Sequence, residues 1–213
     1  MRSSLLELLA PSVCPACDSP RRPGTPRLCD LCRSQLIPLR LLRGVPTALA
    51  YEGTGAELVQ RFKFDGRRDA LCVLLEPLIE RVAELRVDSI VPLPRHPERV
   101  RELGRDPVYE LARALTKRTR LPLESGVLRR TRATPPQTGL SPRARRTNVA
   151  GSFAARPGTL EGRRALLLDD VITTGATLAA AASELRRMAK PHTVLPLALA
   201  GTPALLSGGL ALL

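Results

Sequence analysis

Residues 165–178 read Ala-Leu-Leu-Leu-Asp-Asp-Val-Ile-Thr-Thr-Gly-Ala-Thr-Leu, and this stretch decides the fold. The apolar run at 166–168 is typical of a strand that is buried on both faces in a parallel sheet. Two carboxylates, Asp169 and Asp170, follow it, and small residues then lead into an alanine-rich helix expected at 176–189. The predicted unit is therefore a strand joined to a helix by a turn of threonine and glycine.

A turn of this kind directs free backbone N–H groups, the positive end of the helix dipole and threonine hydroxyls at one point. It favours a phosphate held by Thr173, Thr174, Gly175, Ala176 and Thr177. The adjacent carboxylates can accept hydrogen bonds from sugar hydroxyls or bind Mg²⁺ through water. An ordinary strand and helix start is the alternative, but it does not account for two consecutive aspartates before three threonines. The pattern thus indicates phosphate, ribose and a divalent metal together.

The run from Asp169 to Thr177 resembles the phosphoribosyl pyrophosphate (PRPP) signature of type I phosphoribosyltransferases. Other motifs make the chain similar to the ComF branch of these proteins (ComFC, GntX-like): the CxxC pairs near the N-terminus, Val91-Pro92-Leu93-Pro94, and the series Gln137, Leu140, Arg145, Asn148 and Phe153. The resemblance covers most of residues 14–200. It implies an α/β fold, in which a type I phosphoribosyltransferase core with a parallel sheet carries a small N-terminal zinc module and a hood-like segment.

The resemblance also implies roles for particular residues. Asp169 and Asp170 would hold the ribose of PRPP, 173–177 its 5′-phosphate, and a mobile catalytic loop at 129–148 would close over it with Arg145. Magnesium would accompany PRPP. The pyrophosphate would lie against a loop that its prolines stiffen, made of Val91, Pro92, Leu93, Pro94 and Arg95. The chain departs from the pattern at Ala144, where relatives often carry glutamate, and at Leu103, Arg105 and Pro107.

Four of the five cysteines form two pairs with the spacing of metal-binding knuckles: Cys14, Cys17, Cys29 and Cys32. Four thiolates in this arrangement can surround one Zn²⁺ tetrahedrally, and we expect a structural zinc site. Iron in a rubredoxin-like site and disulfides or a redox pair are the alternatives. Disulfides fit a cytosolic chain poorly, and the cytoplasm is the expected location.

The composition limits the classes of function. The chain of 213 residues carries a net charge of +13, which is almost wholly due to arginine because Lys63, Lys117 and Lys190 are its only lysines. This charge favours polyanions, either phosphate ligands or nucleic acid. An aromatic content of 2% argues against an extended base-stacking surface, and no apolar run of the length of a membrane span is present.

The expected organisation has four segments: a zinc module with an N-terminal helix and connector at 1–46, a hood-like segment at 47–84, the core at 85–200 and a tail at 201–213. Strands are expected at 47–51, 88–91, 125–128, 166–168 and 194–199, and helices at 56–64, 71–85, 107–118 and 176–189. Strands that alternate with helices in the core predict right-handed crossovers and a parallel sheet.

Two functions from different classes follow. The first is Mg²⁺-dependent binding of PRPP with transfer of its phosphoribosyl group to a nitrogen nucleophile. The second is a non-catalytic competence-type protein that senses PRPP, assists DNA uptake, or binds single-stranded DNA or a protein of the competence machinery. The sequence indicates neither the acceptor of the phosphoribosyl group nor the oligomeric state.

Overall fold

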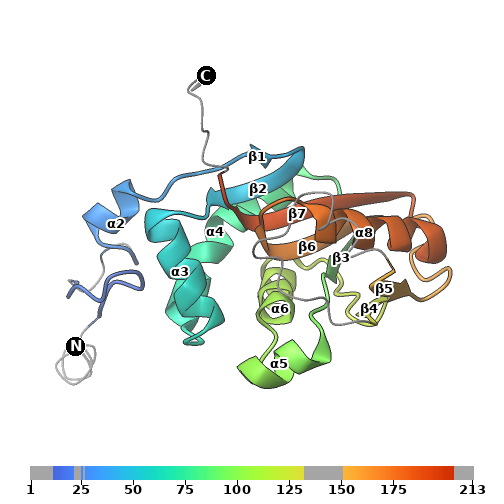
Figure 1. Cartoon of the computed structure of the whole chain (residues 1–213). Coiled ribbons are helices and arrows are strands. Elements are labelled where there is room, and N and C mark those ends of the chain that lie inside the picture. Colours follow the sequence, from blue (N-terminus) through green and yellow to red (C-terminus); the bar gives the residue numbers. More distant parts are fainter. Residues whose placement is uncertain (1–11, 22–24, 26, 132–150, 204–213) are drawn as a thin grey trace, which may run out of the picture.

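The computed structural model describes residues 12–21, 25, 27–131 and 151–203, and Figure 1 shows the arrangement of its elements. In chain order these are α2 (Asp30–Ser34), β1 (Leu41–Leu42), β2 (Val45–Ala50), α3 (Gly53–Lys63), α4 (Arg68–Glu84), β3 (Ser89–Pro92), α5 (Pro97–Leu103), α6 (Pro107–Thr119), β4 (Leu128–Arg130), β5 (Phe153–Ala155), β6 (Arg164–Ile172), α8 (Ala176–Glu184), the π-helical turn η1 (Leu185–Ala189) and β7 (Thr193–Gly201).

The main sheet has five strands in the order β1-β2-β7-β6-β3. Strands β2, β7, β6 and β3 run parallel to one another, and the short β1 is joined antiparallel to β2 at one edge. Helices connect the parallel strands, as such crossovers require. The predicted α/β fold with a parallel sheet is confirmed.

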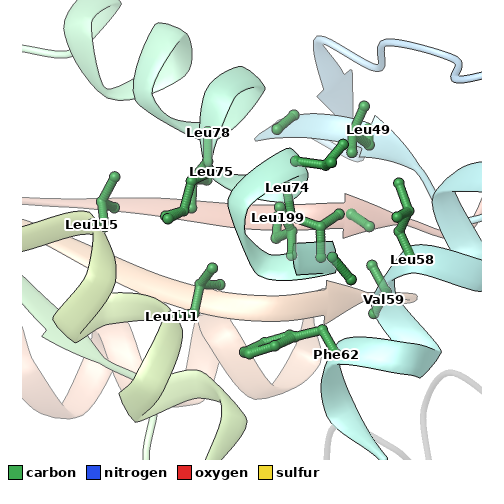
Figure 2. Packing of buried hydrophobic residues seen from close by; sticks show 14 of the residues in the cluster. Leu49, Leu58, Val59, Phe62, Leu74, Leu75, Leu78, Leu111, Leu115 and Leu199 are labelled. Carbon is green, nitrogen blue, oxygen red and sulfur yellow. The ribbon is translucent and has the colours of Figure 1, made fainter. Parts of the chain in front are cut away.

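Side chains at 165–168 of β6 alternate between two hydrophobic cores, because successive residues of a strand point to opposite faces. Leu166 and Leu168 pack with α3, α4 and α6 on one face, in the cluster that Figure 2 shows around Phe62. Ala165 and Leu167 pack on the other face, in a cluster that includes residues of α8 and β5. The central strand is therefore buried on both sides, as its continuous apolar run predicts.

The strand expected at 125–128 does not join the parallel sheet, and this prediction was wrong. Ser125 and Gly126 lie in a turn, and the strand β4 begins only at Leu128. It pairs antiparallel with β5 in a separate sheet of two strands. Serine and glycine favour turns, and the apolar residues around them do not reveal which strand will be the partner.

A helix, α5, occupies the arginine-rich stretch after residue 95, which the sequence did not distinguish from a loop. Pro97 stands in its first turn, and the backbone N–H of Glu98 donates to Nδ1 of His96 at 3.4 Å. Proline is well suited to the first turn of a helix because it lacks an N–H group to satisfy. His96 thus caps a helix, a role that the sequence analysis did not consider.

Several predictions concern residues outside the described ranges: the N-terminal helix, the tail beyond residue 203, and the part of the catalytic loop that carries Gln137, Arg145 and Asn148. The division into four segments also stays a prediction. Strand β2, which begins in the expected connector and continues into the expected hood segment, is part of the main sheet. Among the described residues, no helix has the length and apolar character needed to cross a membrane.

Gly55 allows α3 to start directly against the sheet. A Cβ atom at this position would lie 2.4 Å from the carbonyl oxygen of Ala50, which belongs to β2. That oxygen is part of the backbone, so the contact can be relieved only by moving the strand or the helix. The close approach therefore requires glycine where the first turn of α3 packs against the end of β2.

We therefore predict that Gly55→Ala lowers the free energy of unfolding by about 1–3 kcal/mol, the usual effect of an overpacked contact. Gly126→Ala is the matched control, because its Cβ would meet only side-chain atoms of Arg156 at 3.6 Å or more. Urea denaturation followed by circular dichroism measures both changes. Equal stability of the two variants would contradict the proposed constraint on α3.

Candidate functional site

The carboxyl ends of β3 and β6 bring two predicted motifs together. Pro92 lies beside Leu168 in the sheet, and the backbone N–H of Leu93 donates to the carbonyl oxygen of Leu168 at 2.8 Å. Leu93, Pro94 and Arg95 therefore leave the sheet next to the point where Asp169 and Asp170 stand. Ligands of open α/β sheets commonly bind at the carboxyl ends of the strands.

The two aspartates lie within β6 and face opposite sides of the sheet. Asp170 shares its face with Leu166 and Leu168, and therefore points toward the side covered by α3. Asp169 shares its face with Leu167, on the side covered by α8. The sequence suggested one pair at the rim of the site, but adjacent residues of a strand cannot occupy the same face.

Asp170 is the centre of an ion-pair network. Its Oδ2 atom accepts a hydrogen bond from Nη2 of Arg95 at 2.5 Å and lies 2.9 Å from Nζ of Lys63. Only 6% of the Asp170 side chain is exposed. Burial acts to raise the pKa of Asp170, but the neighbouring charges of Lys63 and Arg95 outweigh it and hold the pKa below its usual value. Asp170 is therefore a charged carboxylate that joins β6, α3 and the loop after β3.

Asp169 has a different environment. Its Oδ1 atom accepts a hydrogen bond from the backbone N–H of Asp170 at 2.8 Å. Although part of its surface is accessible, desolvation by the surrounding protein and repulsion by the charge of Asp170 raise the pKa of Asp169 to about 7. Asp169 is therefore poised to exchange a proton near neutral pH, whereas Asp170 is not.

Arg130 is a cation within electrostatic reach of Asp169. Its guanidinium group lies over the ring of Phe153, 5.5 Å from the ring centroid. Burial lowers the pKa of Arg130, and the charge of Asp169 partly restores it. Arg130 belongs to β4, which leads into the segment where the catalytic loop is expected. It contributes positive charge on the α8 side of the site.

The threonine and glycine turn follows β6 as predicted. Gly175 adopts the left-handed conformation with φ of 76° and caps α8, and the backbone N–H of Ala176 points toward Oγ1 of Thr174 at 3.5 Å. Thr173 is exposed, Thr174 and Thr177 are half-buried, and Ala176 is buried. The first turn of a helix of nine residues thus supplies N–H groups beside accessible threonines, which suits an anion.

A cavity of about 840 Å³ extends from this turn along α8. Thr174 and Gly175 line one end of it, and Arg43, Phe153 and Ser183 line other parts. Neither aspartate lines this cavity. The cavity therefore adjoins the turn and α8 and not the carboxylates.

The carboxylates fit magnesium only in part. One oxygen of Asp170 is taken by Lys63 and Arg95, and among the described residues the only group of three or more potential metal ligands is the cysteine cluster. A magnesium ion at Asp169 would therefore need most of its ligands from water and from phosphate, which is how Mg²⁺ commonly binds with phosphate substrates. The residues present suit a metal that arrives with its ligand.

The four cysteines predicted to hold a metal come together in space. The sulfur atoms of Cys14, Cys17, Cys29 and Cys32 all lie within 4.8 Å of one another. Sγ of Cys17 and Sγ of Cys29 are 3.7 Å apart, close to the ~3.8 Å expected for sulfurs around a tetrahedral ion with Zn–S bonds of ~2.3 Å. The cluster can hold a structural metal such as zinc.

The cysteine module is attached to α3 and α4. Asp18, one residue after Cys17, adopts the left-handed conformation, and its carboxylate accepts hydrogen bonds from Arg61 and Arg67. Cys14 and Cys32 are buried in the same hydrophobic cluster as Phe62. Because Arg61 and Lys63 are both on α3, the module supports the helix that delivers Lys63 to Asp170.

Sequence reasoning did not identify Lys63 or Asp106 as part of the site. Lys63 comes from α3, far from the signature in the chain, and only the packing of α3 on the sheet brings it there. Asp106 caps α6 by accepting from the backbone N–H of Tyr109 at 3.1 Å, and burial raises its pKa. The sequence held one indication that Lys63 is special, because it is one of only three lysines among the 33 lysine and arginine residues.

The geometry defines an α/β protein with a candidate anion site at the carboxyl ends of its parallel strands, and the comparisons specify the family. The chain is 30% identical to the DNA utilization protein YhgH of Salmonella typhi over 184 residues, which cover 83% of this chain and 78% of that protein. It is 26% identical to competence protein ComFC of Bacillus subtilis, over 90% of this chain and 78% of that protein. The chain belongs to the family of these competence and DNA utilization proteins.

A third relative is competence protein F of Haemophilus influenzae, which is 31% identical over 140 residues. The match covers 62% of this chain and only 61% of that protein. No family model matches the chain.

Similar solved structures include the glutamine PRPP amidotransferase of B. subtilis, with a TM-score of 0.44 and 20% identity over 66% of this chain and 30% of that one. Another is the adenine phosphoribosyltransferase of Trypanosoma brucei, with a TM-score of 0.40 and 11% identity over 85% of this chain and 88% of that one. At these TM-scores the likenesses carry no argument about activity.

The raised pKa of Asp169 predicts how stability depends on pH. The folded protein holds this proton up to a pKa of about 7, whereas the unfolded chain releases it near the ordinary aspartate pKa of 3.8. The charge of Asp169 therefore lowers the stability of the fold as pH rises between these values. We expect Asp169→Asn to change stability little at pH 4 and to increase it at pH 8, by up to about 4 kcal/mol.

Thermal melting of the two proteins from pH 4 to pH 8 measures this difference. Asp88→Asn is the matched control with the opposite sign, because the ion pair with Arg164 lowers the pKa of Asp88 to about 2. That variant should lose stability at pH 8, and the loss should fade as pH falls toward 2. An Asp169→Asn variant that is destabilised at pH 8 would contradict the described environment.

The cysteine cluster predicts one tightly bound metal ion per chain. Because binding of a structural metal supplies folding free energy, we expect Cys32→Ser to lose the ion and to expose residues 12–36 to protease. The main sheet should keep its protection from hydrogen exchange. Elemental analysis of protein purified without oxygen or chelators distinguishes zinc from iron. Finding neither metal at stoichiometric amount would refute this prediction.

Proposed function

We propose that the protein binds PRPP with Mg²⁺ and transfers the phosphoribosyl group to a nitrogen nucleophile. The observation that carries this proposal is the meeting of the two motifs: Arg95, from the predicted pyrophosphate loop, contacts Asp170 of the predicted PRPP signature. A phosphate at 173–177, a ribose at Asp169 and a diphosphate at Val91–Arg95 would then lie along one edge of the sheet. Arg95 and Lys63 supply the positive charge that a diphosphate needs.

In the proposed reaction the bond from C1′ to the pyrophosphate oxygen breaks and a bond from C1′ to the nitrogen of the acceptor forms. The nitrogen loses one proton, and pyrophosphate leaves with the electron pair of the broken bond. Magnesium, when bound with the diphosphate, supplies further charge neutralisation. The protein groups orient the reactants and stabilise the developing charge, and no side chain acts as a covalent nucleophile. Asp169, with its pKa of about 7, is the candidate that holds the ribose or accepts the proton.

Arg145 is proposed as a further catalytic residue on the loop that closes over PRPP, a role that rests on the family resemblance alone. The metal of the cysteine cluster is proposed to be zinc with a structural role. A cytoplasmic location likewise stays a proposal, based on paired cysteines that suit a reducing compartment.

The second candidate function is a non-catalytic role in DNA uptake, by contact with single-stranded DNA or with a protein of the competence machinery. It is supported by the names of the relatives, which are competence proteins and a DNA utilization protein. The net charge of +13 suits such a partner. Binding of PRPP without release of pyrophosphate from any acceptor would favour this second function.

We predict that Asp169→Asn weakens binding of Mg²⁺-PRPP by about tenfold or more, because a hydrogen bond to a charged group contributes about 1.5–3 kcal/mol. Isothermal titration calorimetry with and without Mg²⁺ measures the effect. Asp88→Asn is the control, since Asp88 is a paired carboxylate at the opposite end of the same strands. Unchanged affinity of the Asp169 variant would refute the proposed ribose contact, and absence of binding by the unmodified protein would refute the function.

A further inference from the structure

Both carboxylate oxygens of Asp170 are occupied by groups of the protein itself. Its Oδ2 atom receives Nη2 of Arg95 at 2.5 Å and Nζ of Lys63 at 2.9 Å. Its Oδ1 atom accepts a hydrogen bond from the backbone N–H of Val171 at 2.7 Å. With only 6% of its side chain exposed, Asp170 has little surface left for a sugar hydroxyl. Asp170 therefore suits a role within the protein better than direct contact with a ribose.

The two cations that contact Asp170 are more accessible than the carboxylate. The side chain of Lys63 is 14% exposed, and that of Arg95 is 25% exposed. An ammonium group has three donors and a guanidinium group has five, so neither cation exhausts its donors on one oxygen atom. A ligand that approaches this network therefore reaches the cations before the carboxylate.

Arg95 carries a second indication of an anionic ligand. Its Nε atom is buried and has no hydrogen-bond partner among the described residues. Buried donors without an acceptor are rare in folded proteins, because they have lost their contact with water and gained nothing in return. A ligand oxygen that accepted from this N–H group would complete the hydrogen bonding of Arg95.

Asp170 also allows two cations to stand at one point. Two positive charges that contact the same oxygen atom repel each other, and the carboxylate offsets this repulsion. Lys63 ends α3 and Arg95 follows β3, so the carboxylate on β6 joins two elements that are distant in the chain. Without this carboxylate the two side chains would separate, and their charge would no longer be concentrated in one place.

We propose that Asp170 is a positioning residue for a diphosphate group: it holds Lys63 and Arg95 side by side as a two-cation site and does not contact the ribose. The inference rests on the proposed function and assigns different parts of PRPP to the two aspartates. Asp169 serves the ribose, whereas Asp170 serves the pyrophosphate through the two cations. The family resemblance alone assigned both carboxylates to the ribose.

Ligands that contain only part of PRPP separate the two roles. Pyrophosphate lacks the ribose, and ribose 5-phosphate lacks the diphosphate. In isothermal titration calorimetry at one fixed Mg²⁺ concentration, we expect Asp170→Asn to weaken the binding of pyrophosphate and of PRPP by about tenfold or more. The affinity of this variant for ribose 5-phosphate should stay unchanged. Asp169→Asn should instead weaken the binding of ribose 5-phosphate and spare that of pyrophosphate.

The direction of the change in Asp170→Asn distinguishes positioning from a simple effect of charge. A carboxylate repels a nearby anion, so its removal would tighten the binding of pyrophosphate if Asp170 acted by its charge alone. A loss of affinity is expected because the carboxylate acts through the cations that it holds. Asp170→Glu, which keeps the charge, should recover part of the affinity.

Two further variants distinguish this role from a general loss of stability. Lys63→Met removes one cation and should show the same pattern of affinities as Asp170→Asn. The double variant should lose little more than either single variant, because the groups act as a unit. Asp88→Asn is the matched control, since Asp88 is an ion-paired carboxylate at the opposite end of the parallel strands. It should lose stability and keep the affinities for all three ligands.

The outcomes separate this inference from the function on which it rests. If the unmodified protein binds neither pyrophosphate, ribose 5-phosphate nor PRPP, the proposed function fails. If the ligands bind and Asp170→Asn weakens ribose 5-phosphate as much as pyrophosphate, Asp170 contacts the ribose and the inference is wrong. If Lys63→Met leaves the affinity for pyrophosphate unchanged, or Asp170→Asn raises it, the two-cation site is refuted.

Discussion

The structure of the site depends on one buried carboxylate, that of Asp170. It receives Arg95 from the loop after β3 and Lys63 from the end of α3, so three elements distant in the chain meet at a single oxygen atom. A carboxylate this deeply buried is costly to keep charged unless cations accompany it, and loss of one partner would leave an uncompensated charge. The pair of cations therefore fixes the geometry of the site as well as its charge.

Because side chains alternate along β6, the two aspartates lie in different environments. Asp170 faces α3 and is already paired, whereas Asp169 faces the side of α8 and has a pKa raised to about 7. A ligand that enters at the carboxyl ends of the strands therefore meets one fixed carboxylate and one that can change its proton. Arg130 and the turn at Gly175 add positive charge and N–H groups on the side of Asp169. These groups can contact a phosphate and a sugar, and they do not require a metal ion whose ligands all come from the protein.

The cysteine module, α3 and the sheet are mechanically connected. Asp18 links the knuckle at Cys17 to Arg61 and Arg67, and buried cysteines pack with Phe62. Gly55 lets α3 begin against β2, and Lys63 ends that helix at Asp170. A metal held by the cysteine cluster would thus stabilise the position of the helix that carries Lys63.

The sequence by itself determined the strand, turn and helix around Asp169 and Asp170, the cysteine cluster and the parallel α/β class, because these follow from residues close together in the chain. It placed a strand at 125–128 wrongly, since a short apolar run does not specify its partner. Only the tertiary structure decided that the two aspartates act on opposite faces, and that Lys63 joins Asp170. These facts depend on which helix packs on which face of the sheet. The burial of many apolar side chains fixes that choice, and no local pattern records it.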